Sequence, residues 1–282
     1  MYITLLRATI LFIFLLLITF PTLNGDEKEF SIVTYNVLAD KVHYNERVPS
    51  LLNILKKSDA DIIALQEVAP WFIQELLKEQ WIKKYHLPKL SNNIVAPRGL
   101  LILSKNPISN ITYDYLPTRQ YRAYFITNTN INGVDFTIAT CHLESPLNAG
   151  LIRAKQLEVF FKKLKPFENV IFLGDFNFGD GEQPETKNIP NAYKDMWTLT
   201  NPKKKGYTWN IEVSSMAKAG SFPGEKSRRI DRILYKSSKI IMKSTEILGN
   251  ESIDKNKKLF PSDHFGLRGT FTLKQEIKRK KK

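Results

Sequence analysis

An aspartate and a histidine, Asp263 and His264, stand side by side in the stretch FPSDHFGLRGTF, directly before residues that read as a β-strand. A carboxylate and an imidazole placed together can help hold a cation, bind a phosphate or move a proton. A single Asp-His pair in a turn needs no function, because Asp and Ser side chains bond to their own backbone there. A functional role for Asp263 and His264 is supported only if similar residues recur elsewhere in the chain.

Similar residues do recur, and each stands in, at the end of or just past a segment that reads as a strand. They are Asn36 in TYNVL, Glu67 after IIALQ, His142 after TIATC, Asp175 and Asn177 after VIFLG, and Asp231 in RRIDRILY. Strand ends lie side by side along one edge of a layered α/β fold, and their loops form the site. The repeated placement predicts that these side chains share one polar site.

The residue types indicate the chemistry of that site. Carboxylate and amide oxygens suit Mg²⁺ or Mn²⁺, and a chain with a single cysteine, Cys141, offers no cysteine cluster for structural zinc. Hydrolysis of a phosphodiester needs an activated water, stabilisation of charge on phosphorus and help for the leaving oxygen. Carboxylates, amides and two histidines supply all three, so the sequence predicts metal-assisted phosphoester hydrolysis.

The elements that must position this site alternate between strand and helix patterns. Runs of apolar, β-branched and aromatic residues predict strands at residues 30–38, 61–68, 100–104, 123–131, 134–143, 169–176, 228–235 and 265–273. Apolar residues at helical spacing predict helices around residues 48–55 and 157–164. Asn132 and Gly133 suit a tight hairpin turn, and residues 178–226 read as mostly loop. The alternation predicts one α/β domain.

The two ends of the chain differ from its middle in composition. An apolar run after Arg7 makes residues 1–25 resemble a secretory signal peptide or, if they are retained, a short membrane anchor. A single domain is expected over residues 28–275, and residues 276–282 form a basic tail. These features predict a secreted protein or one in the lumen of the secretory pathway, with membrane anchoring as the alternative.

The charge of the chain limits its partners. The chain of 282 residues has 42 basic and 28 acidic residues, giving a net charge of +14. Such a surplus favours anionic partners, either nucleic acid or an acidic membrane surface. Nucleic acid is the expected substrate, and a membrane enters only if the N-terminal segment is retained or the substrate is a lipid. One cysteine excludes an internal disulfide, and no feature predicts a protein partner, so a monomer is expected.

Six motifs, in order along the chain, resemble those of the endonuclease/exonuclease/phosphatase superfamily, also called deoxyribonuclease I-like. They are TYNVLAD, IIALQEV, CHLES, GDFN, RIDRILY and SDHFGL, and together they cover most of the chain. The resemblance implies an α/β fold, a four-layered sandwich of two mixed β-sheets flanked by helices. It also implies Mg²⁺-dependent hydrolysis of a phosphoester bond.

The resemblance implies a metal site and a phosphate site within the polar set. Glu67 of LQEV matches the metal-binding glutamate of the family. Asn36 is placed near metal and phosphate, and Asp263 near the metal, which it binds directly or through water. Asn177 of GDFN matches a phosphate contact.

The resemblance also implies catalytic roles for the remaining members of the set. Asp175 matches the residue proposed to orient or deprotonate the attacking water. His264 matches the histidine that hydrogen-bonds the phosphate and that serves as the base in some members. Asp231 would hold the tautomer of His264 and raise its pKa, as an orienting carboxylate does. His142 of CHLES matches a candidate acid for the leaving group, and which group acts as the base stays open.

Two further residues are expected to contact the substrate, each with a structural alternative. Trp209 in YTWN is suited to stacking on a base or an aromatic group, and packing in the core is the alternative. Arg122 is suited to a phosphate contact, and a plain surface arginine is the alternative. His43 and His86 match no motif and are expected in loops or at the surface.

The later motifs are most similar to those of the 5′-tyrosyl-DNA phosphodiesterases. The segments SPLNAG and FNFGD carry no arginine where those enzymes tend to have one, so an endonuclease acting on nucleic acid is kept beside that activity. Sphingomyelinases and inositol-phosphate phosphatases share the core residues and form the membrane-facing alternative. An inactive basic binding protein at a membrane is the non-enzymatic alternative, and the intact set of site residues argues against it.

Overall fold

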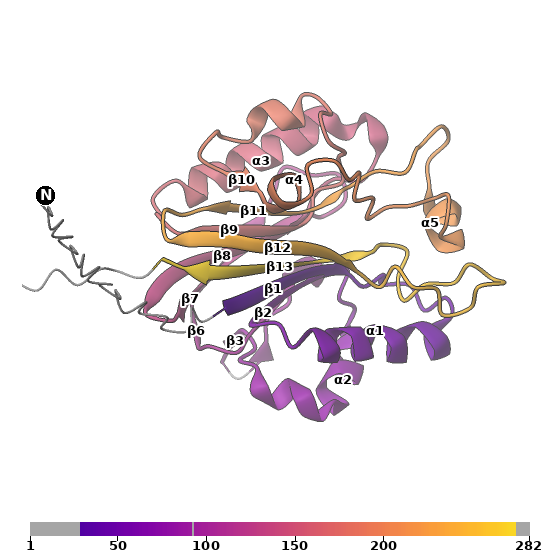
Figure 1. Cartoon of the computed structure of the whole chain (residues 1–282), viewed down its shortest axis with the longest axis horizontal. Helices are drawn as coiled ribbons and strands as arrows, with labels where there is room; N and C mark the ends of the chain where they lie inside the picture. Colours follow the sequence, from indigo (N-terminus) through magenta and orange to yellow (C-terminus); the bar gives the residue numbers. More distant parts are fainter. Residues whose placement is uncertain (1–28, 92, 275–282) are drawn as a thin grey trace, which may run out of the picture.

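The computed structural model describes residues 29–91 and 93–274. Two mixed β-sheets lie face to face with helices on their outer sides, which gives four layers (Figure 1). This arrangement confirms the α/β sandwich expected from the sequence. The signal peptide predicted at residues 1–25 and the basic tail predicted at 276–282 lie outside the described residues, and the domain limits 28–275 stay a prediction.

The first sheet has five strands in the order β12-β13-β1-β2-β5. Strands β1 (Glu29–Asn36) and β2 (Ile62–Gln66) run parallel inside it. Strand β13 (Gly266–Leu273) pairs antiparallel with β1, and β5 (Leu101–Ser104) pairs antiparallel with β2. Strand β12 (Ile240–Leu248) extends the sheet beyond β13.

The second sheet has six strands in the order β10-β11-β9-β8-β7-β6 and repeats the same pattern. Strands β8 (Val134–His142) and β9 (Val170–Asp175) run parallel at its centre. The antiparallel strands are β11 (Asp231–Lys236), β10 (Lys194–Asp195), β7 (Ala123–Ile131) and β6 (Ile108–Tyr115). A separate two-stranded ladder joins β3 (Lys89–Leu90) and β4 (Asn93–Ile94).

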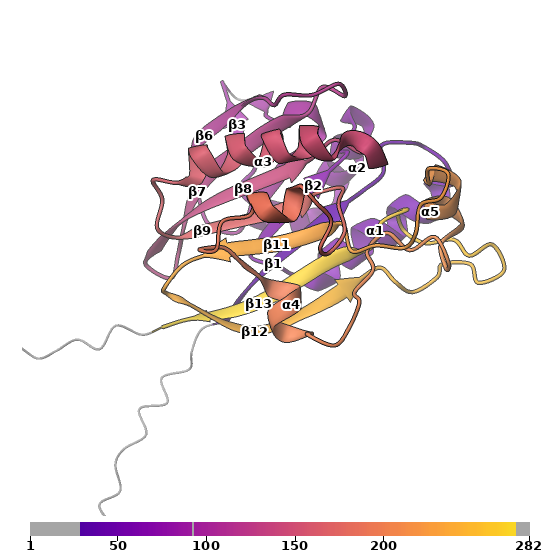
Figure 2. The same ribbon diagram turned by 90° about the horizontal axis from the view of Figure 1, so that it is seen from above.

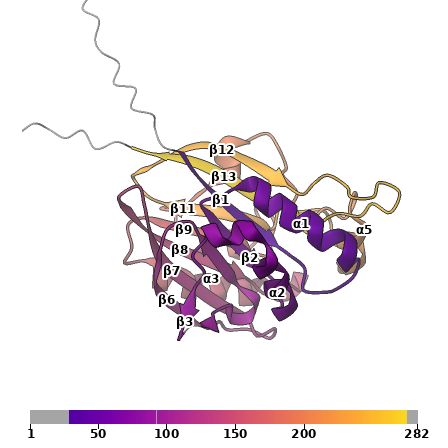
Figure 3. The same cartoon turned by 90° about the horizontal axis from the view of Figure 1, so that it is seen from below.

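Helices cover the outer face of each sheet. Helices α1 (Tyr44–Ser58) and α2 (Pro70–Lys78) pack on the first sheet (Figure 3), and α3 (Gly150–Leu164) packs on the second (Figure 2). The short helices are α4 (Met196–Thr200), α5 (Ser215–Gly220) and the 3₁₀ segments η1 (Gln80–Lys84), η2 (Pro97–Gly99), η3 (Leu147–Ala149) and η4 (Glu185–Asn188). Within the described ranges, no helix has both the length and the apolar character needed to cross a membrane.

The central strands are buried on both faces, which explains their unbroken apolar sequences. In β1, Phe30 and Ile32 point into the layer between the sheets, while Val33 and Tyr35 point toward α1 and α2. Alternation along a strand sends successive side chains to opposite faces. With both faces of each sheet filled by packing, the strand ends at one edge are left to carry polar side chains.

Candidate active site

Strand register places three of the predicted residues next to one another. Asp175 is the last residue of β9, and its register partners are His142 on β8 and Asp231 on β11. A slip of one residue would turn these side chains to the opposite face of the sheet. The hydrophobic alternation that fixes the register therefore also fixes the site.

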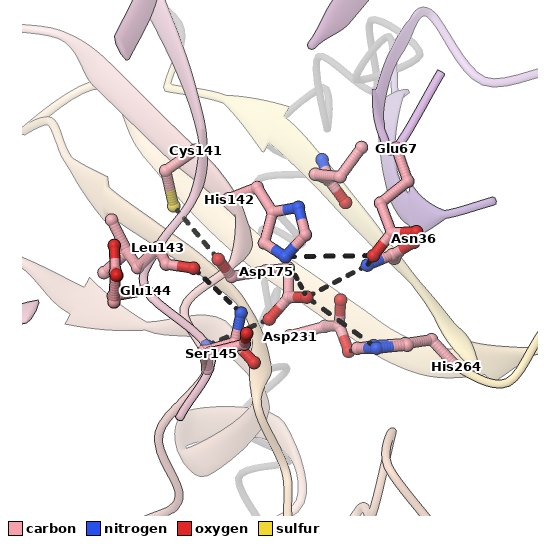
Figure 4. Close-up of polar contacts among 12 residues, drawn as sticks. Asn36, Glu67, Cys141, His142, Leu143, Glu144, Ser145, Asp175, Asp231 and His264 are labelled. Carbon is pink, nitrogen blue, oxygen red and sulfur yellow. Dashed lines mark hydrogen bonds and ion pairs between the residues drawn. The ribbon is translucent and has the colours of Figure 1, made fainter. Parts of the chain in front are cut away.

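The facing sheet contributes an amide and a carboxylate from the ends of its parallel pair. The Nδ2 of Asn36 donates to Oδ2 of Asp175 at 3.0 Å and to Oε1 of Glu67 at 3.2 Å (Figure 4). The Oδ1 of Asn36 accepts from the backbone N–H of Leu38 at 3.1 Å. Because that bond fixes the amide, Asn36 presents its NH₂ group, and not its oxygen, to the two carboxylates.

Asp175 is the centre of the constellation. Its Oδ1 accepts from the backbone N–H of Asn177 at 2.9 Å, and its Oδ2 lies 3.4 Å from Nε2 of His142 and 3.7 Å from Nε2 of His264. The carboxylate is only 1% exposed. Burial raises the pKa of Asp175 to about 7, although the positive charge of His264 opposes this shift.

His264 and Asp231 form a buried pair beside Asp175. The Nδ1 of His264 lies 2.9 Å from Oδ2 of Asp231, so Nδ1 carries a proton and donates it to the carboxylate. Burial alone would lower the pKa of His264, but the carboxylates of Asp231 and Asp175 outweigh burial and hold the pKa well above its ordinary value. The expected orienting role of Asp231 fits this geometry.

His142 is the opposite case. Its Nδ1 lies 2.9 Å from Nη1 of Arg122. A guanidinium has only donors, so Nδ1 must accept and the proton sits on Nε2, which points toward Asp175. Burial, with the positive charges of Arg122 and His264, holds the pKa of His142 well below its ordinary value. Two buried histidines in one site are therefore held in different protonation states.

Glu67 and Asp263 supply the oxygen donors that a divalent cation needs. The Oε2 of Glu67 accepts from the backbone N–H of Ala39 at 3.0 Å, and the side chain is 27% exposed. The Oδ1 of Asp263 accepts from Oγ of Ser262 at 3.1 Å. Burial raises the pKa of Asp263, and the nearby negative charge of Glu67 adds to the rise. Two carboxylates that repel each other at the edge of a cavity fit a hard divalent ion.

A second set of ligand atoms is close enough for a metal but is already engaged. One atom each from Asp175, Asp231 and His264 lie within 4.8 Å of one another. The imidazole of His264 donates to Asp231 and is held protonated, so it has no free lone pair for a cation. The Glu67 and Asp263 pair is therefore the better cation site.

A cavity of about 180 Å³ opens onto these groups. Its lining includes Arg122, Trp209 and Phe222. The ring of Trp209 lies 4.9 Å from that of His264 between centroids and is 7% exposed, so the indole packs on the histidine while it lines the cavity. Arg122 is half-buried and is not a plain surface arginine.

The ten predicted site residues come together, each lining the cavity or bonded to a residue that does. His43 and His86 are exposed, and Cys141 is buried in the core, as the sequence indicates. Asn177 has its backbone in the left-handed region, with φ of 54°, and its Nδ2 donates to the carbonyl of Leu143 at 3.0 Å. Its role as a phosphate contact stays a prediction.

Sequence reasoning missed the residue that holds the Arg122 loop in place. Glu144 is 1% exposed, and its carboxylate accepts from Oγ1 of Thr118 at 2.6 Å and from the backbone N–H of Arg119 at 3.0 Å. These bonds fix the segment that leads into Arg122. The only signal was its place inside the CHLES motif, two residues after the strand that ends at His142.

The fold and this site define a class of phosphoester-cleaving proteins. Residues 33–264 match the Endonuclease/Exonuclease/phosphatase family, and the chain belongs to that family. The match confirms the resemblance inferred from the six motifs.

Within that class, several curated proteins that are similar to this chain share one name. The chain is 30% identical over 260 residues to Tyrosyl-DNA phosphodiesterase 2 of Xenopus tropicalis, covering 88% of this chain and 67% of that protein. It is 29% identical over 250 residues to Tyrosyl-DNA phosphodiesterase 2 of Homo sapiens, covering 84% and 67%. The chain thus spans about two thirds of the length of these relatives.

Solved structures agree with the sequence comparison. D. rerio TDP2 in complex with a single strand DNA product has a TM-score of 0.72 and 25% identity, covering 86% of this chain and 99% of that chain. An endonuclease/exonuclease/phosphatase from Bacteroides vulgatus has a TM-score of 0.66 at 16% identity, covering 88% and 100%, and shows the fold alone.

Proposed function

We propose that the protein is a divalent-metal-dependent phosphodiesterase that acts on nucleic acid, with a 5′-phosphotyrosyl bond to DNA as its preferred substrate. One observation carries the proposal: a single carboxylate, Asp175, faces two histidines in opposite protonation states and an amide from the other sheet. Such a set can accept a proton, stabilise charge and donate hydrogen bonds around one phosphorus.

The reaction requires one proton to be removed and one to be supplied. The oxygen of a water molecule bonds to phosphorus, the bond from phosphorus to the tyrosine oxygen breaks, and that oxygen takes up a proton. Asp175 accepts the proton from the water, because its Oδ2 faces the cavity groups. His142 is neutral and carries its hydrogen on Nε2, so it donates a hydrogen bond to the departing oxygen, and the proton that this oxygen takes up comes from water.

The other polar groups hold the phosphate while its charge builds up. His264 is protonated and directs Nε2–H toward the phosphate oxygens, with Asp231 fixing the ring. Arg122 provides a second cationic donor at the cavity wall, and Asn177 offers the amide hydrogen that Leu143 leaves unused. Donors fixed before the reaction stabilise the transition state without reorganisation.

The cation belongs at Glu67 and Asp263, and we assign it as Mg²⁺, with Mn²⁺ as a substitute. Both residues offer hard oxygen atoms, and Mg²⁺ is held by few carboxylates while phosphate and water complete its coordination. When bound, the ion neutralises charge on the phosphate oxygens. Asn36 orients the Glu67 carboxylate through its NH₂ group and does not act as a metal ligand through its oxygen.

The substrate assignment draws on three observations. The relatives that cover most of this chain are named tyrosyl-DNA phosphodiesterases. The net charge of +14 favours a polyanion. An aromatic wall, made by Trp209 and the 38% exposed Phe222, suits a base or a tyrosine ring. Secretion rests on residues 1–25 alone and stays a prediction, which sequencing of the mature N-terminus would test.

The function is tested with the purified chain, with Mg²⁺ or with EDTA, and His264→Ala as the matched blank. The substrates are a 5′-phosphotyrosyl oligonucleotide, the same oligonucleotide without tyrosine, plasmid DNA, RNA and sphingomyelin. We expect Mg²⁺-dependent release of tyrosine that leaves a 5′-phosphate. Internal cleavage of plasmid in its place would make the protein an endonuclease, and cleavage of sphingomyelin alone would overturn the nucleic-acid assignment.

A further inference from the structure

An arginine lies between two exposed tyrosine rings outside the cavity. The guanidinium carbon of Arg98 is 4.9 Å from the ring centroid of Tyr115 and 5.3 Å from that of Tyr121. Tyr115 is 59% exposed and Tyr121 is 69% exposed. We call Arg98, Tyr115 and Tyr121 the tyrosine platform. A hollow of about 170 Å³ beside it is lined in part by Arg98, Tyr115 and Tyr113.

The platform is held to the catalytic site from two sides. Gly99, next to Arg98, has φ of +77°, and a Cβ there would lie 3.3 Å from Cα of Glu67. The backbone N–H of Val68 donates to the carbonyl of Gly99 at 2.9 Å, which locks this segment against the residue after Glu67. On the other side, Tyr121 directly precedes Arg122, which contacts His142. The platform therefore borders the cavity on its Glu67 and Arg122 side.

The platform also has the properties of a binding surface and not of a packing cluster. Its rings are largely exposed, whereas aromatic rings that stabilise the core are buried. Over residues 29–91 and 93–274, no carboxylate forms an ion pair with Arg98; the nearby Asp114 uses Oδ1 to accept from the backbone N–H of Tyr115 at 2.8 Å. Nη2 of Arg98 donates to the hydroxyl of Tyr115, which is neutral, so the positive charge of Arg98 is not balanced there and can pair with an anion.

We propose that the tyrosine platform binds a single-stranded segment of the nucleic-acid substrate next to the scissile phosphate. Tyrosine faces stack on bases of any identity, and an arginine beside them pairs with a phosphate, which is the combination that single-stranded nucleic acid requires. Gly99 packs against Glu67 and Tyr121 adjoins Arg122, and both Glu67 and Arg122 line the cavity, so this segment belongs to the same strand as the reacting phosphate. The inference deepens the proposed function and rests on it for the identity of the ligand.

Binding is measured without hydrolysis, on the full chain in EDTA, by fluorescence anisotropy with a labelled 5′-phosphorylated dT₁₀ strand. We expect Tyr121→Ala and Arg98→Ala each to weaken binding about fivefold or more, the scale of one lost stacking or charged contact. Arg98→Ala should also reduce the salt dependence of the affinity by about one counterion. Tyr121→Phe keeps the ring and Lys56→Ala removes a charge from the exposed side of α1, so both should bind like the parent.

Turnover separates this inference from the proposed function. The parent and the alanine variants are compared on a 5′-phosphotyrosyl decanucleotide and on thymidine 5′-(4-nitrophenyl) phosphate, which has no strand to reach the platform. The alanine variants should lose more kcat/KM on the decanucleotide than on the nitrophenyl ester, by a factor of about five or more. Equal losses on both substrates, or unchanged affinity for dT₁₀ in both alanine variants, would overturn the platform. If the parent cleaves neither substrate, the proposed function fails, and the anisotropy result still decides the platform.

Discussion

The two parallel strand pairs at the centre of the molecule have the same architecture and end in different chemistry. In each sheet a parallel pair is flanked by antiparallel strands. The β1–β2 pair leads to Asn36 and Glu67, and the Glu67 side chain is 27% exposed. The β8–β9 pair ends in His142 and Asp175, which are 6% and 1% exposed. An accessible carboxylate suits an exchangeable cation, whereas buried groups suit proton transfer.

The difference shows that burial, more than residue type, assigns the roles. Glu67 and Asp175 are both carboxylates at the end of a parallel strand pair, but Glu67 is 27% exposed, whereas Asp175 is buried and burial raises its pKa to about 7. The two histidines are both buried, and their neighbours separate them, because His142 faces a guanidinium and His264 faces a carboxylate. Substitutions that alter one side at a time should therefore give different kinetic and titration behaviour.

The largest effect is expected from Asp175→Asn, which removes the proton acceptor while keeping the shape of the side chain. We expect kcat on the 5′-phosphotyrosyl oligonucleotide to fall about 10³-fold, within the usual range for loss of an acid–base group. Raising the Mg²⁺ concentration should not restore kcat, since Asp175 belongs to the buried proton-transfer groups and not to the cation site. A fall of less than tenfold in steady-state kinetics would remove Asp175 from the reaction.

A smaller loss is expected from His264→Ala, which removes a charge-stabilising donor. We expect kcat to fall about 10²-fold, the scale for loss of one preorganised donor. Asp231→Asn should reproduce part of this loss, because it leaves the ring in place without its orienting carboxylate. If Asp231→Asn were the more damaging change, orientation could not be the role of Asp231.

Glu67→Gln tests the solvent-accessible carboxylate of the proposed cation site. We expect activity at low Mg²⁺ to fall on the order of tenfold, the lower part of the range for a disturbed metal site. High Mg²⁺ or Mn²⁺ should recover part of it, because the weakened ligand lowers the affinity for the cation. A Mg²⁺ titration of parent and variant makes the measurement, and a loss that no metal concentration relieves would place Glu67 with the proton-transfer groups.

The smallest expected effect is a difference in protonation state between His142 and His264. In metal-free protein between pH 6 and 7.5, the lowered pKa of His142 favours its neutral ring, and the raised pKa of His264 favours its charged ring. Nitrogen chemical shifts of the two imidazoles across this pH range report both states. Rings that titrate together near pH 6.5 would show that their partners do not set their protonation.

Most of the central strands were predictable from the sequence because they are buried on both faces and read as apolar runs. Strand β6 was missed because its sequence, ISNITYDY, is polar and largely exposed at the edge of the sheet. Strand β12 lies at an edge too and carries polar residues on its open side. Helix α2 was missed because it is short, with only Phe72 and Leu76 fully buried.

The site residues were predictable as a set, since each follows a strand and belongs to a motif. Their hydrogen bonds were not, because these join segments that are distant in sequence. The bond from Asn36 to Asp175 joins residues 139 positions apart, and only the packed sheets reveal that Asn36 presents its NH₂ group. The pairing of His142 with Arg122 likewise depends on a loop held by Glu144.

The hydrogen bond between Asn36 and Asp175 spans the two sheets, so each sheet holds only half of the catalytic apparatus. A chain in which one sheet has formed, or in which both have formed without docking, has no complete site. During refolding from denaturant, the return of turnover should therefore lag behind the return of far-ultraviolet circular dichroism. Recovery of enzyme activity therefore reports the last step of folding, in which the two sheets dock against each other.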